Sequence, residues 1–287
     1  MKRNSGMVYA GPMTAWASVF FLAPLLIIVV YSFLKKGLYG GVTPEFSLEA
    51  YTALKNPNIA VIALKTLSIS FASTAITILI ALPCGYFMAR SKYQTLLLML
   101  IIVPFWTNFL IRVYAWMNIL GSNGFLNDFL RHLGLIKDGI HFLYNKNAVI
   151  LVLVYMYLPY AILPLFSSID KFDFSLLEAA RDLGATGVQA IFKVLLPNIR
   201  SGVYTACLFT FIPIFGAYAV PLLVGGKDSY MLGNVVADQL TKSRNWPLAS
   251  AISMALTLVT TIGVMSMLTL QLRDEKRLGK TSKRGKI

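Results

Sequence analysis

Six long apolar runs limit how this chain can fold more than any other feature of its sequence. Each run has 19 to 26 residues, and only 13% of the 287 residues of the chain are charged. Soluble domains carry about 25% charged residues, and a helix needs roughly 20 residues to cross the hydrocarbon of a bilayer. We therefore predict an all-α polytopic membrane protein with six transmembrane helices. The predicted spans are residues 16–34, 66–89, 95–120, 148–169, 203–224 and 248–272.

The segments outside the runs define the predicted organisation of the chain. A cytoplasmic N-terminus, residues 1–15, precedes the membrane domain, residues 16–272, and a basic tail, residues 273–287, follows it. No connecting segment exceeds 33 residues, which excludes a large soluble domain. Lys2 and Arg3 precede the first run as in a signal peptide. The run is long, however, and no A-x-A site follows it, which favours an uncleaved anchor.

The distribution of basic residues predicts the orientation of the spans. With both termini inside, the cytoplasmic segments hold 15 Lys and Arg in 68 residues, whereas the outer segments hold 10 in 81. This asymmetry follows the positive-inside rule and places both termini in the cytoplasm. The net charge of +14 is therefore mainly a topology signal. It argues weakly for a nucleic-acid partner, because the basic residues are spread over both faces of the membrane.

Prolines are frequent inside the predicted spans. Each proline removes a backbone donor and tends to kink a helix, which a membrane tolerates where neighbours or a water-filled cavity satisfy the freed carbonyls. The pattern favours a moving bundle around a cavity, although proline is also commoner in membrane helices generally. The prolines are Pro24, Pro83, Pro104, Pro159, Pro164, Pro213 and Pro221.

Motifs that would support catalysis are missing from the sequence. There is no G-x-S-x-G or H-E-x-x-H motif. Gly279 begins a Gly-Lys-Thr triplet like the end of a phosphate-binding loop, but Asp274 stands where that motif needs glycine. His132 and His141 are nine residues apart in an outer loop, a spacing that suggests solvated histidines rather than a metal site. We therefore predict no enzyme, no metal and no cofactor bound by this chain.

A polar stretch between two apolar runs, "EAARDLGATGVQAIFKVLLP", predicts a short helix on the cytoplasmic side. Ser175 is followed three residues later by Glu178, which matches a capping box and predicts a helix that starts at about Leu176. Gly184 stands where this helix would stop, because glycine readily adopts the left-handed conformation of a helix end.

A second helix is predicted directly after the first one. Thr186 and Gln189 repeat the capping pattern, and this helix is expected to end near Pro197. An amphipathic helix lying on lipid is one interpretation of the pair, but such helices carry bulky apolar and basic residues. The first helix instead combines alanines with Glu178 and Asp182, which favours docking into a groove of another protein.

The same stretch resembles the cytoplasmic motif of permease subunits of ABC importers. Val194 stands where that motif usually has isoleucine. The resemblance implies that the first helix, within the cytoplasmic loop 170–202, is a coupling helix. It would contact a partner ATPase that binds ATP and Mg²⁺ and would pass nucleotide-driven closure to the membrane helices. The matching residues are Glu178, Ala179, Ala180, Gly184, Leu196 and Pro197.

A narrower resemblance covers nearly the whole chain. The stretches "LIIVPFWTNFLIRVYAW", "SSIDKFDFSLLEAARDLGA", and "GNVVADQL" followed by "NWPLASA" are similar to the PotB-type spermidine/putrescine permease family. This resemblance implies a type I ABC importer permease fold with a core of six helices in the bacterial inner membrane. It also implies a second permease, a pair of ATPases, an external substrate-binding protein and polyamine transport.

Arg112 is the one charged residue well within a predicted span, about eight residues or roughly 12 Å from the outer end of its helix. Such a charge costs at least ~2.5 kcal/mol and normally has a partner or a function. Asn108, Arg112 and Trp116 are spaced four apart and form one polar and aromatic stripe. Arg112 would repel a polyamine. It therefore either ties helices together, through backbone carbonyls or the second permease, or contacts an anion.

Aromatic residues in the spans are candidates for the substrate path, since an aromatic face attracts cations. Each of them has an alternative role in packing or as an interfacial anchor. None of the twelve Asp and Glu lies in a predicted span, so carboxylates on a polyamine path would come from loops or from the partner subunit. The candidates are Trp106, Trp116, Tyr155 and Tyr157.

Other transport classes remain as alternatives. An ion-coupled secondary transporter typically uses Asp, Glu or His inside the membrane, and the predicted spans contain none of these residues. A channel or an assembly scaffold would operate without ATP. Within the ABC class, a permease for another small solute, such as an anion, is the alternative that Arg112 suggests.

Overall fold

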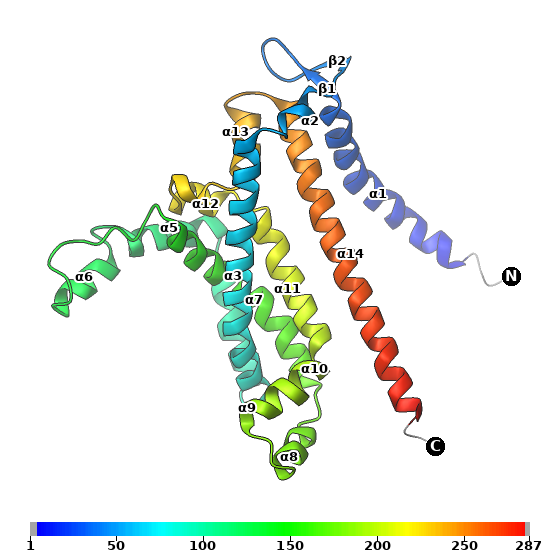
Figure 1. Ribbon diagram of the computed structural model, residues 1–287, viewed down its shortest axis with the longest axis vertical. Coiled ribbons are helices and arrows are strands. Elements are labelled where there is room, and N and C mark those ends of the chain that lie inside the picture. Colours follow the sequence, from blue (N-terminus) through cyan, green and yellow to red (C-terminus); the bar gives the residue numbers. More distant parts are fainter. Residues whose placement is uncertain (1–4, 285–287) are drawn as a thin grey trace. The chain divides into compact units, whose positions relative to one another are not determined.

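The computed structural model describes residues 5–284, with side chains described for residues 10–269 and Gln271 (Figure 1). The predicted basic tail and most of the predicted N-terminal segment lie outside the residues with described side chains. The chain forms two compact units. One comprises the residues up to Ala63 together with Leu232–Thr260, and the other comprises Leu64–Met231 and the residues from Thr261 onward.

The first unit contains a small β-hairpin, so the prediction of an all-α chain was wrong at this point. Strands β1 and β2 pair antiparallel, with Leu34 opposite Phe46. The turn between them contains Gly40 and Gly41, whose φ angles of +98° and +76° suit glycine because it has no Cβ. The elements are α1 (Ser5–Ser32), β1 (Leu34–Lys36), β2 (Val42–Phe46), α2 (Glu49–Ala53), α13 (Leu232–Thr241) and the start of α14 (Trp246–Arg284).

The second unit is built almost entirely from helices. Helix α3 (Pro57–Arg90) begins in the first unit and continues into it. The elements that follow are α4 (Gln94–Ile102), η1 (Val103–Trp106), α5 (Phe109–Leu120), α6 (Phe125–His132), α7 (Lys146–Asp170), α8 (Ser175–Asp182), α9 (Gly187–Ala190), the π-helical turn η2 (Ile191–Leu195), α10 (Leu196–Asn198), α11 (Arg200–Phe215), α12 (Ala219–Val224) and η3 (Lys227–Ser229).

Four helices of the described chain are long and apolar enough to cross a membrane, and a fifth span counts if a bent pair is included. The structure therefore supports a multi-pass protein but does not confirm the predicted count of six. The continuous span 203–224 was a wrong prediction, because α11 ends at Phe215 and α12 begins at Ala219. Glycine at 216 caps α11, and Pro221 stands in the first turn of α12, where no amide donor is needed. The four spans are Ala10–Ser32, Pro57–Arg90, Lys146–Asp170 and Trp246–Thr269.

The predicted span 95–120 is also broken, with a bend of 91° between Gln94–Trp106 and Phe109–His132. Thr107 is extended, with ψ at 149°, and the side-chain oxygen of Asn108 accepts a hydrogen bond of 2.8 Å from the amide of Leu110. An asparagine cap of this kind starts a new helix. Arg112 lies in the first turn of α5, eight residues before its last residue Leu120, so the predicted distance of roughly 12 Å to the end of the helix holds along α5.

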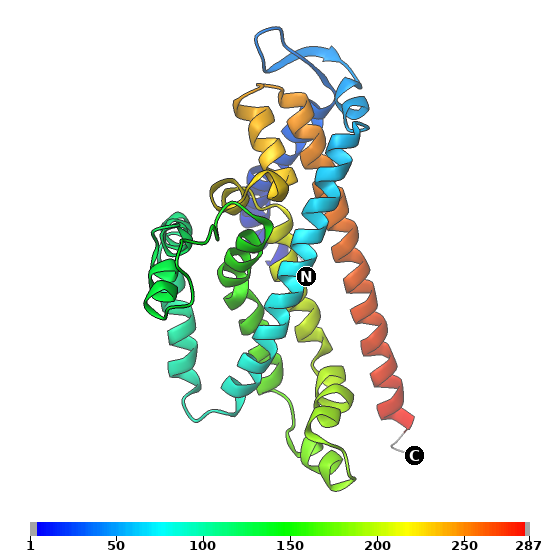
Figure 2. The same cartoon turned by 60° about the vertical axis from the view of Figure 1, so that its left-hand side comes forward.

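Helix α7 is the centre of the second unit. It stays continuous although Pro159 and Pro164 lie inside it. Helix α11 runs beside α7 in both views (Figures 1 and 2), and Gly202 marks their close approach. A Cβ at Gly202 would collide with the side chain of Ser168. The largest core cluster joins α7 to α3, α5 and α11 and includes Ile69, Val113, Val149, Val152, Leu153, Met156 and Ile214.

Candidate functional site

The start of α8 differs from the predicted capping box. The Ser175 side chain caps nothing, and the amide of Ser175 instead donates a hydrogen bond of 3.0 Å to Oδ1 of Asp173. Hydrogen bonds from the side chain and the backbone of Ser175 hold the pKa of the Asp173 carboxyl below its usual value. Glu178 lies in the first turn, where a negative charge interacts favourably with the helix dipole.

The end of α8 confirms the predicted role of Gly184. Its φ is +88°, and its amide donates to the carbonyl of Arg181 at 2.8 Å. The next amide, of Ala185, donates to the carbonyl of Ala180 at 3.0 Å. These two bonds form a Schellman motif, in which a left-handed residue closes the helix. No atom lies within 4 Å of a Cβ built at Gly184, so backbone conformation rather than space requires glycine.

The second predicted capping box is confirmed. The Thr186 side chain accepts from the amide of Gln189 at 3.3 Å, and the Gln189 side chain accepts from the amide of Thr186 at 3.1 Å. The chain then passes through a π-helical turn and ends this helical segment at Asn198, close to the predicted end at Pro197. The loop is therefore fixed by hydrogen bonds at the start and the end of α8 and at the start of α9.

A small core anchors the loop to the ends of two membrane helices. Leu177, Ala190 and Leu195 of the loop are buried in one cluster with Ala89 of α3 and Ile169 of α7. Burial of side chains of this kind stabilises by about 1.5–3 kcal/mol for each large residue. Packed side chains thereby connect α8 to the ends of α3 and α7.

Four large apolar residues of the loop are exposed. We call them the docking face: Leu176, Leu183, Val188 and Phe192. Leu183, the C-cap residue of α8, is 90% exposed. Glu178 and Ala179 are exposed as well, whereas Ala180 is half-buried against the anchoring core. Of the four motif residues, three are therefore exposed, as the docking face is, including Gly184.

A second candidate site is a group of aromatic rings around Arg112, which we call the aromatic cluster. The ring of Tyr155 on α7 lies 5.3 Å from that of Trp116 and 5.6 Å from that of Phe105. The Arg112 guanidinium carbon lies 4.4 Å from the centre of the Phe105 ring. Tyr157, two residues along α7 from Tyr155, packs against the same core cluster as Trp116 and Tyr155. These five residues make up the cluster.

The guanidinium of Arg112 is poorly satisfied within this chain. Its Nε and Nη1 atoms are buried and have no hydrogen-bond partner among the described residues. The contact with Phe105 offsets part of the cost, since a desolvated cation–π pair contributes about 2 kcal/mol. A buried, unpaired charge nevertheless remains expensive. Both atoms are covered by this chain's own atoms, so an acceptor from outside the chain would reach them only if Arg112 or its neighbours move.

Two of the predicted path residues lie apart from the aromatic cluster. Asn108 uses its side-chain oxygen to cap α5. Trp106 is 81% exposed, and its ring makes no described contact with the cluster. The predicted stripe of residues 108, 112 and 116 therefore separates into a cap and two cluster members. Phe105 was missed by sequence reasoning, because its contact with Arg112 depends on the bend after η1.

Sequence reasoning also missed a row of hydroxyls on α3. Ser70, Ser73 and Thr74 are buried, and their hydroxyl groups have no hydrogen-bond partner among the described residues. Their neighbour Ile69 belongs to the same core cluster as Val113, against which Trp116 packs. The signal in the sequence was the hydroxyl spacing in "SISFASTAIT", where small polar residues interrupt an apolar run.

Comparisons with known proteins define the class to which this fold belongs. The crystal structure of a bacterial ABC transporter involved in the import of alginate matches with a TM-score of 0.76 at 17% identity, over 95% of this chain and 96% of that one. Residues 77–279 match the family described as binding-protein-dependent transport system inner membrane component. The chain belongs to this family, has the type I ABC importer permease fold and is a multi-pass protein of the inner membrane.

Closer relatives narrow the family further. The chain is 41% identical over 247 residues to the spermidine/putrescine transport system permease protein PotB of Haemophilus influenzae, covering 85% of this chain and 86% of the relative. It is 39% identical over 246 residues to PotB of Escherichia coli, covering 85% and 90%. It is 32% identical over 288 residues to the E. coli inner membrane ABC transporter permease protein YdcU, covering 95% and 89%.

Proposed function

We propose that this chain is a permease subunit of an ATP-driven importer of polyamines such as spermidine and putrescine. It forms the translocation path with a second permease and works with a pair of ATPases and an external substrate-binding protein. The observation that carries the proposal is the identity of about 40% over most of the chain with permeases named for spermidine and putrescine transport.

The docking face supports the coupling part of this proposal. Its exposed apolar side chains would seat in a groove of the ATPase, with Glu178 at the start of the helix. The ATPase, and not this chain, would bind ATP and Mg²⁺. The Schellman end and the anchoring core hold α8 firmly enough to pass a displacement to α3 and α7. The basic residues of the inner segments favour an orientation with both termini in the cytoplasm.

The aromatic cluster supports a cation path only in part. Trp116, Tyr155 and Tyr157 offer aromatic faces, which attract ammonium groups without a full negative charge. Arg112 repels cations, so it would be neutralised by an acceptor from the second permease. Much of the negative charge on the path would likewise come from the second permease, because the six spans predicted from sequence contain no Asp or Glu.

One observation favours a second candidate, a permease for a small anion. The buried donors of Arg112 that lack a partner in this chain would suit a carboxylate or phosphate on the solute. Trp106 and Asn108 would then lie on the approach to this site.

The two candidates are separated by the solute that stimulates ATP hydrolysis. The complex copurified with this chain is reconstituted with and without its substrate-binding protein, and its ATPase rate is measured with polyamines and with small anions. Stimulation by spermidine or putrescine supports the proposal. Stimulation by an anion alone would support the second candidate, a permease for a small anion. It would still agree with an ABC importer.

A further inference from the structure

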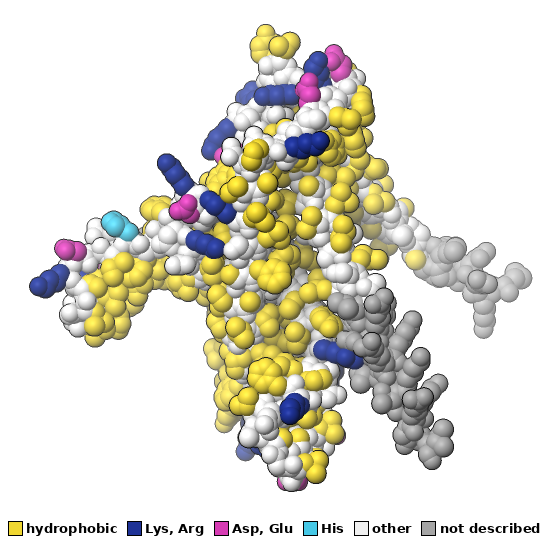
Figure 3. All heavy atoms as spheres, viewed as in Figure 1, with side chains coloured by type: hydrophobic (Ala, Val, Ile, Leu, Met, Phe, Trp, Pro, Cys, Tyr) yellow, Lys and Arg dark blue, Asp and Glu magenta, His cyan; other side chains and the backbone are white. Residues whose placement is uncertain are grey.

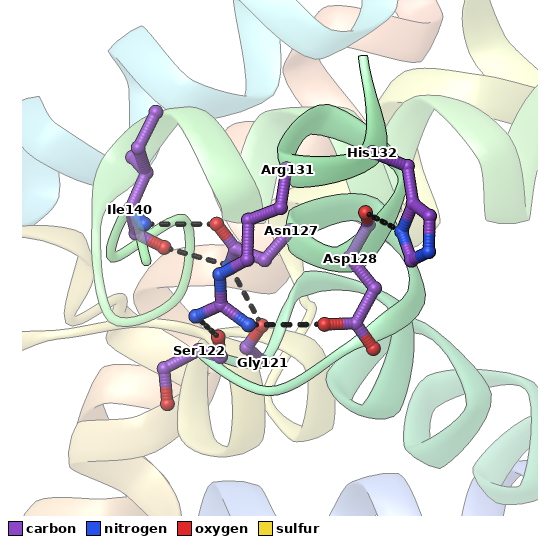
Figure 4. A network of polar contacts seen from close by, with 7 residues as sticks. All are labelled: Gly121, Ser122, Asn127, Asp128, Arg131, His132 and Ile140. Carbon is purple, nitrogen blue, oxygen red and sulfur yellow. Dashed lines mark hydrogen bonds and ion pairs between the residues drawn. The ribbon is translucent and has the colours of Figure 1, made fainter. Parts of the chain in front are cut away.

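The outer loop between α5 and α7 is held in one conformation by a buried asparagine (Figure 4). Asn127 on α6 is fully buried. Its amide donates to the carbonyls of Gly121 at 2.9 Å and Ile140 at 3.0 Å, and its oxygen accepts from the amide of Ile140 at 2.8 Å. Arg131 adds an ion pair of 3.0 Å with Asp128 on the same helix. The network ties both ends of the loop to one side of α6.

The other side of α6 is apolar and exposed. Phe125, Phe129, Leu133 and Leu135 form this surface, which we call the α6 apolar face. Phe125 is 73% exposed, and its ring stacks at 6.3 Å on that of Phe129. Because the network fixes the helix, these rings cannot turn inward to escape water. Hydrophobic side chains of the α6 region gather on the side that faces the α8 end of this unit, and charged side chains lie at its tip (Figure 3).

The length of α3 gives the position of the end of this loop across the thickness of the membrane. Lys146, the first residue of α7, donates to the hydroxyl of Ser68 on α3 at 3.0 Å. Ser68 precedes Arg90, the last residue of α3, by 22 residues, which corresponds to about 33 Å of helix. The hydrocarbon core is about 30 Å thick. Lys146, where the loop ends, therefore lies about one hydrocarbon thickness from the inner end of α3, at the outer surface.

We propose that α6 lies flat in the outer surface of the membrane, with the α6 apolar face inserted among lipid acyl chains. The charged residues Asp128 and Arg131 would stay at the level of the headgroups. Amphipathic helices bind lipid in this way when one side is apolar and the other is polar. A soluble protein that docks from outside would meet the charged side, because the apolar side faces inward along the spans. This placement is independent of which solute the complex carries.

Spin-label accessibility tests the placement in the intact complex. Cys84 and Cys207 are replaced by serine, and a nitroxide is attached at Phe129→Cys in complex reconstituted into lipid vesicles. Collision rates are measured with oxygen, which concentrates in lipid, and with a water-soluble nickel chelate. We expect the oxygen-to-nickel ratio at position 129 to exceed that of the matched control Asp128→Cys several-fold.

Two other results would overturn the proposal. Low collision rates with both reagents at position 129 would show that protein covers the α6 apolar face, as a contact with the second permease would do. A high nickel rate would show that water covers it. Leu133→Cys provides a second position on the same face if the Phe129 variant fails to copurify with the ATPase, and it should give the same lipid pattern.

Discussion

At the scale of single residues, Arg112 is the group that most needs a partner from outside the chain. We predict that Arg112→Ala reduces the amount of second permease that copurifies with this chain, because the substitution removes the guanidinium donors and leaves the proposed acceptor on the second permease unpaired. Arg112→Lys should restore assembly only in part, since lysine keeps the charge but not the planar donor geometry. Quantitative copurification measures both effects.

A different result would change the interpretation of Arg112. If the alanine variant assembles normally, the arginine is not an interface tie. Loss of anion-stimulated ATPase activity in that assembled variant would then identify it as a solute contact, and the polyamine assignment would fail with it.

Trp116 is the second residue with a testable role, as an aromatic face on the substrate path. We predict that Trp116→Ala lowers spermidine or putrescine uptake at an unchanged level of assembled complex, whereas Trp116→Phe retains more uptake because it keeps an aromatic face. Trp106→Ala and Trp106→Phe form the matched pair outside the cluster. Equal uptake in the alanine and phenylalanine variants at position 116 would argue that Trp116 only fills space.

Residue-scale features were predictable from the sequence where the signal is local. Gly184 and the Thr186–Gln189 box act within a few residues of chain, so their spacing was sufficient. The predicted capping role of Ser175 was wrong, because two residues compete to cap one helix and the carboxylate of Asp173 provides the acceptor. The contact of Phe105 with Arg112 joins two elements across a bend, which local spacing does not encode.

At the scale of elements, the break before α5 depends on one cap. We predict that Asn108→Ala destabilises α5 by about 1 kcal/mol, because the amide of Leu110 loses its acceptor. The Asn108→Ser variant keeps a side-chain acceptor, so its stability should be close to that of the parent protein. The measurement is the temperature at which the purified complex loses its assembled state. If serine and alanine behave alike and both lose only uptake, Asn108 contacts the solute rather than capping the helix.

Helix α8, the proposed coupling helix, gives a second prediction at this scale. Gly184→Asp should abolish uptake, because a residue with a Cβ in this left-handed conformation carries about 1–2 kcal/mol of strain and α8 would end differently. Glu178→Lys should do the same by placing a positive charge in the first turn of α8. Membrane insertion of both variants should stay normal, which immunoblotting of membrane fractions checks.

A matched glycine controls for backbone strain. Gly134 in the outer loop has a φ of +69° and equally open surroundings, so Gly134→Asp carries comparable strain far along the chain from α8. Uptake should survive this change much better than Gly184→Asp. Normal uptake in both the Gly184 and Glu178 variants would remove the case for a coupling role.

The spans show how far apolar content predicts elements. Length and hydropathy located helix α7 to within two residues at its start and one at its end. They failed at 95–120, because an apolar run does not reveal that Thr107 is extended and that Asn108 starts a new helix. Proline alone was a poor guide as well, since α7 remains continuous through two prolines and α4 ends near one. A residue that caps a new helix, as Asn108 does, decides whether a span is broken or continuous.

At the scale of the whole molecule, the proposed function is that this chain carries polyamines inward at the expense of ATP. The most direct measurement is uptake of labelled spermidine and putrescine into vesicles that contain the reconstituted complex. ATP and Mg²⁺ are enclosed on the side of the ATPase, and the substrate-binding protein is added outside.

We predict that label accumulates only when ATP and the binding protein are both present, and that Glu178→Lys prevents accumulation without loss of assembled complex. Accumulation without ATP would contradict the importer assignment. A complex whose ATPase responds to another solute, but which accumulates neither spermidine nor putrescine, would contradict the polyamine assignment.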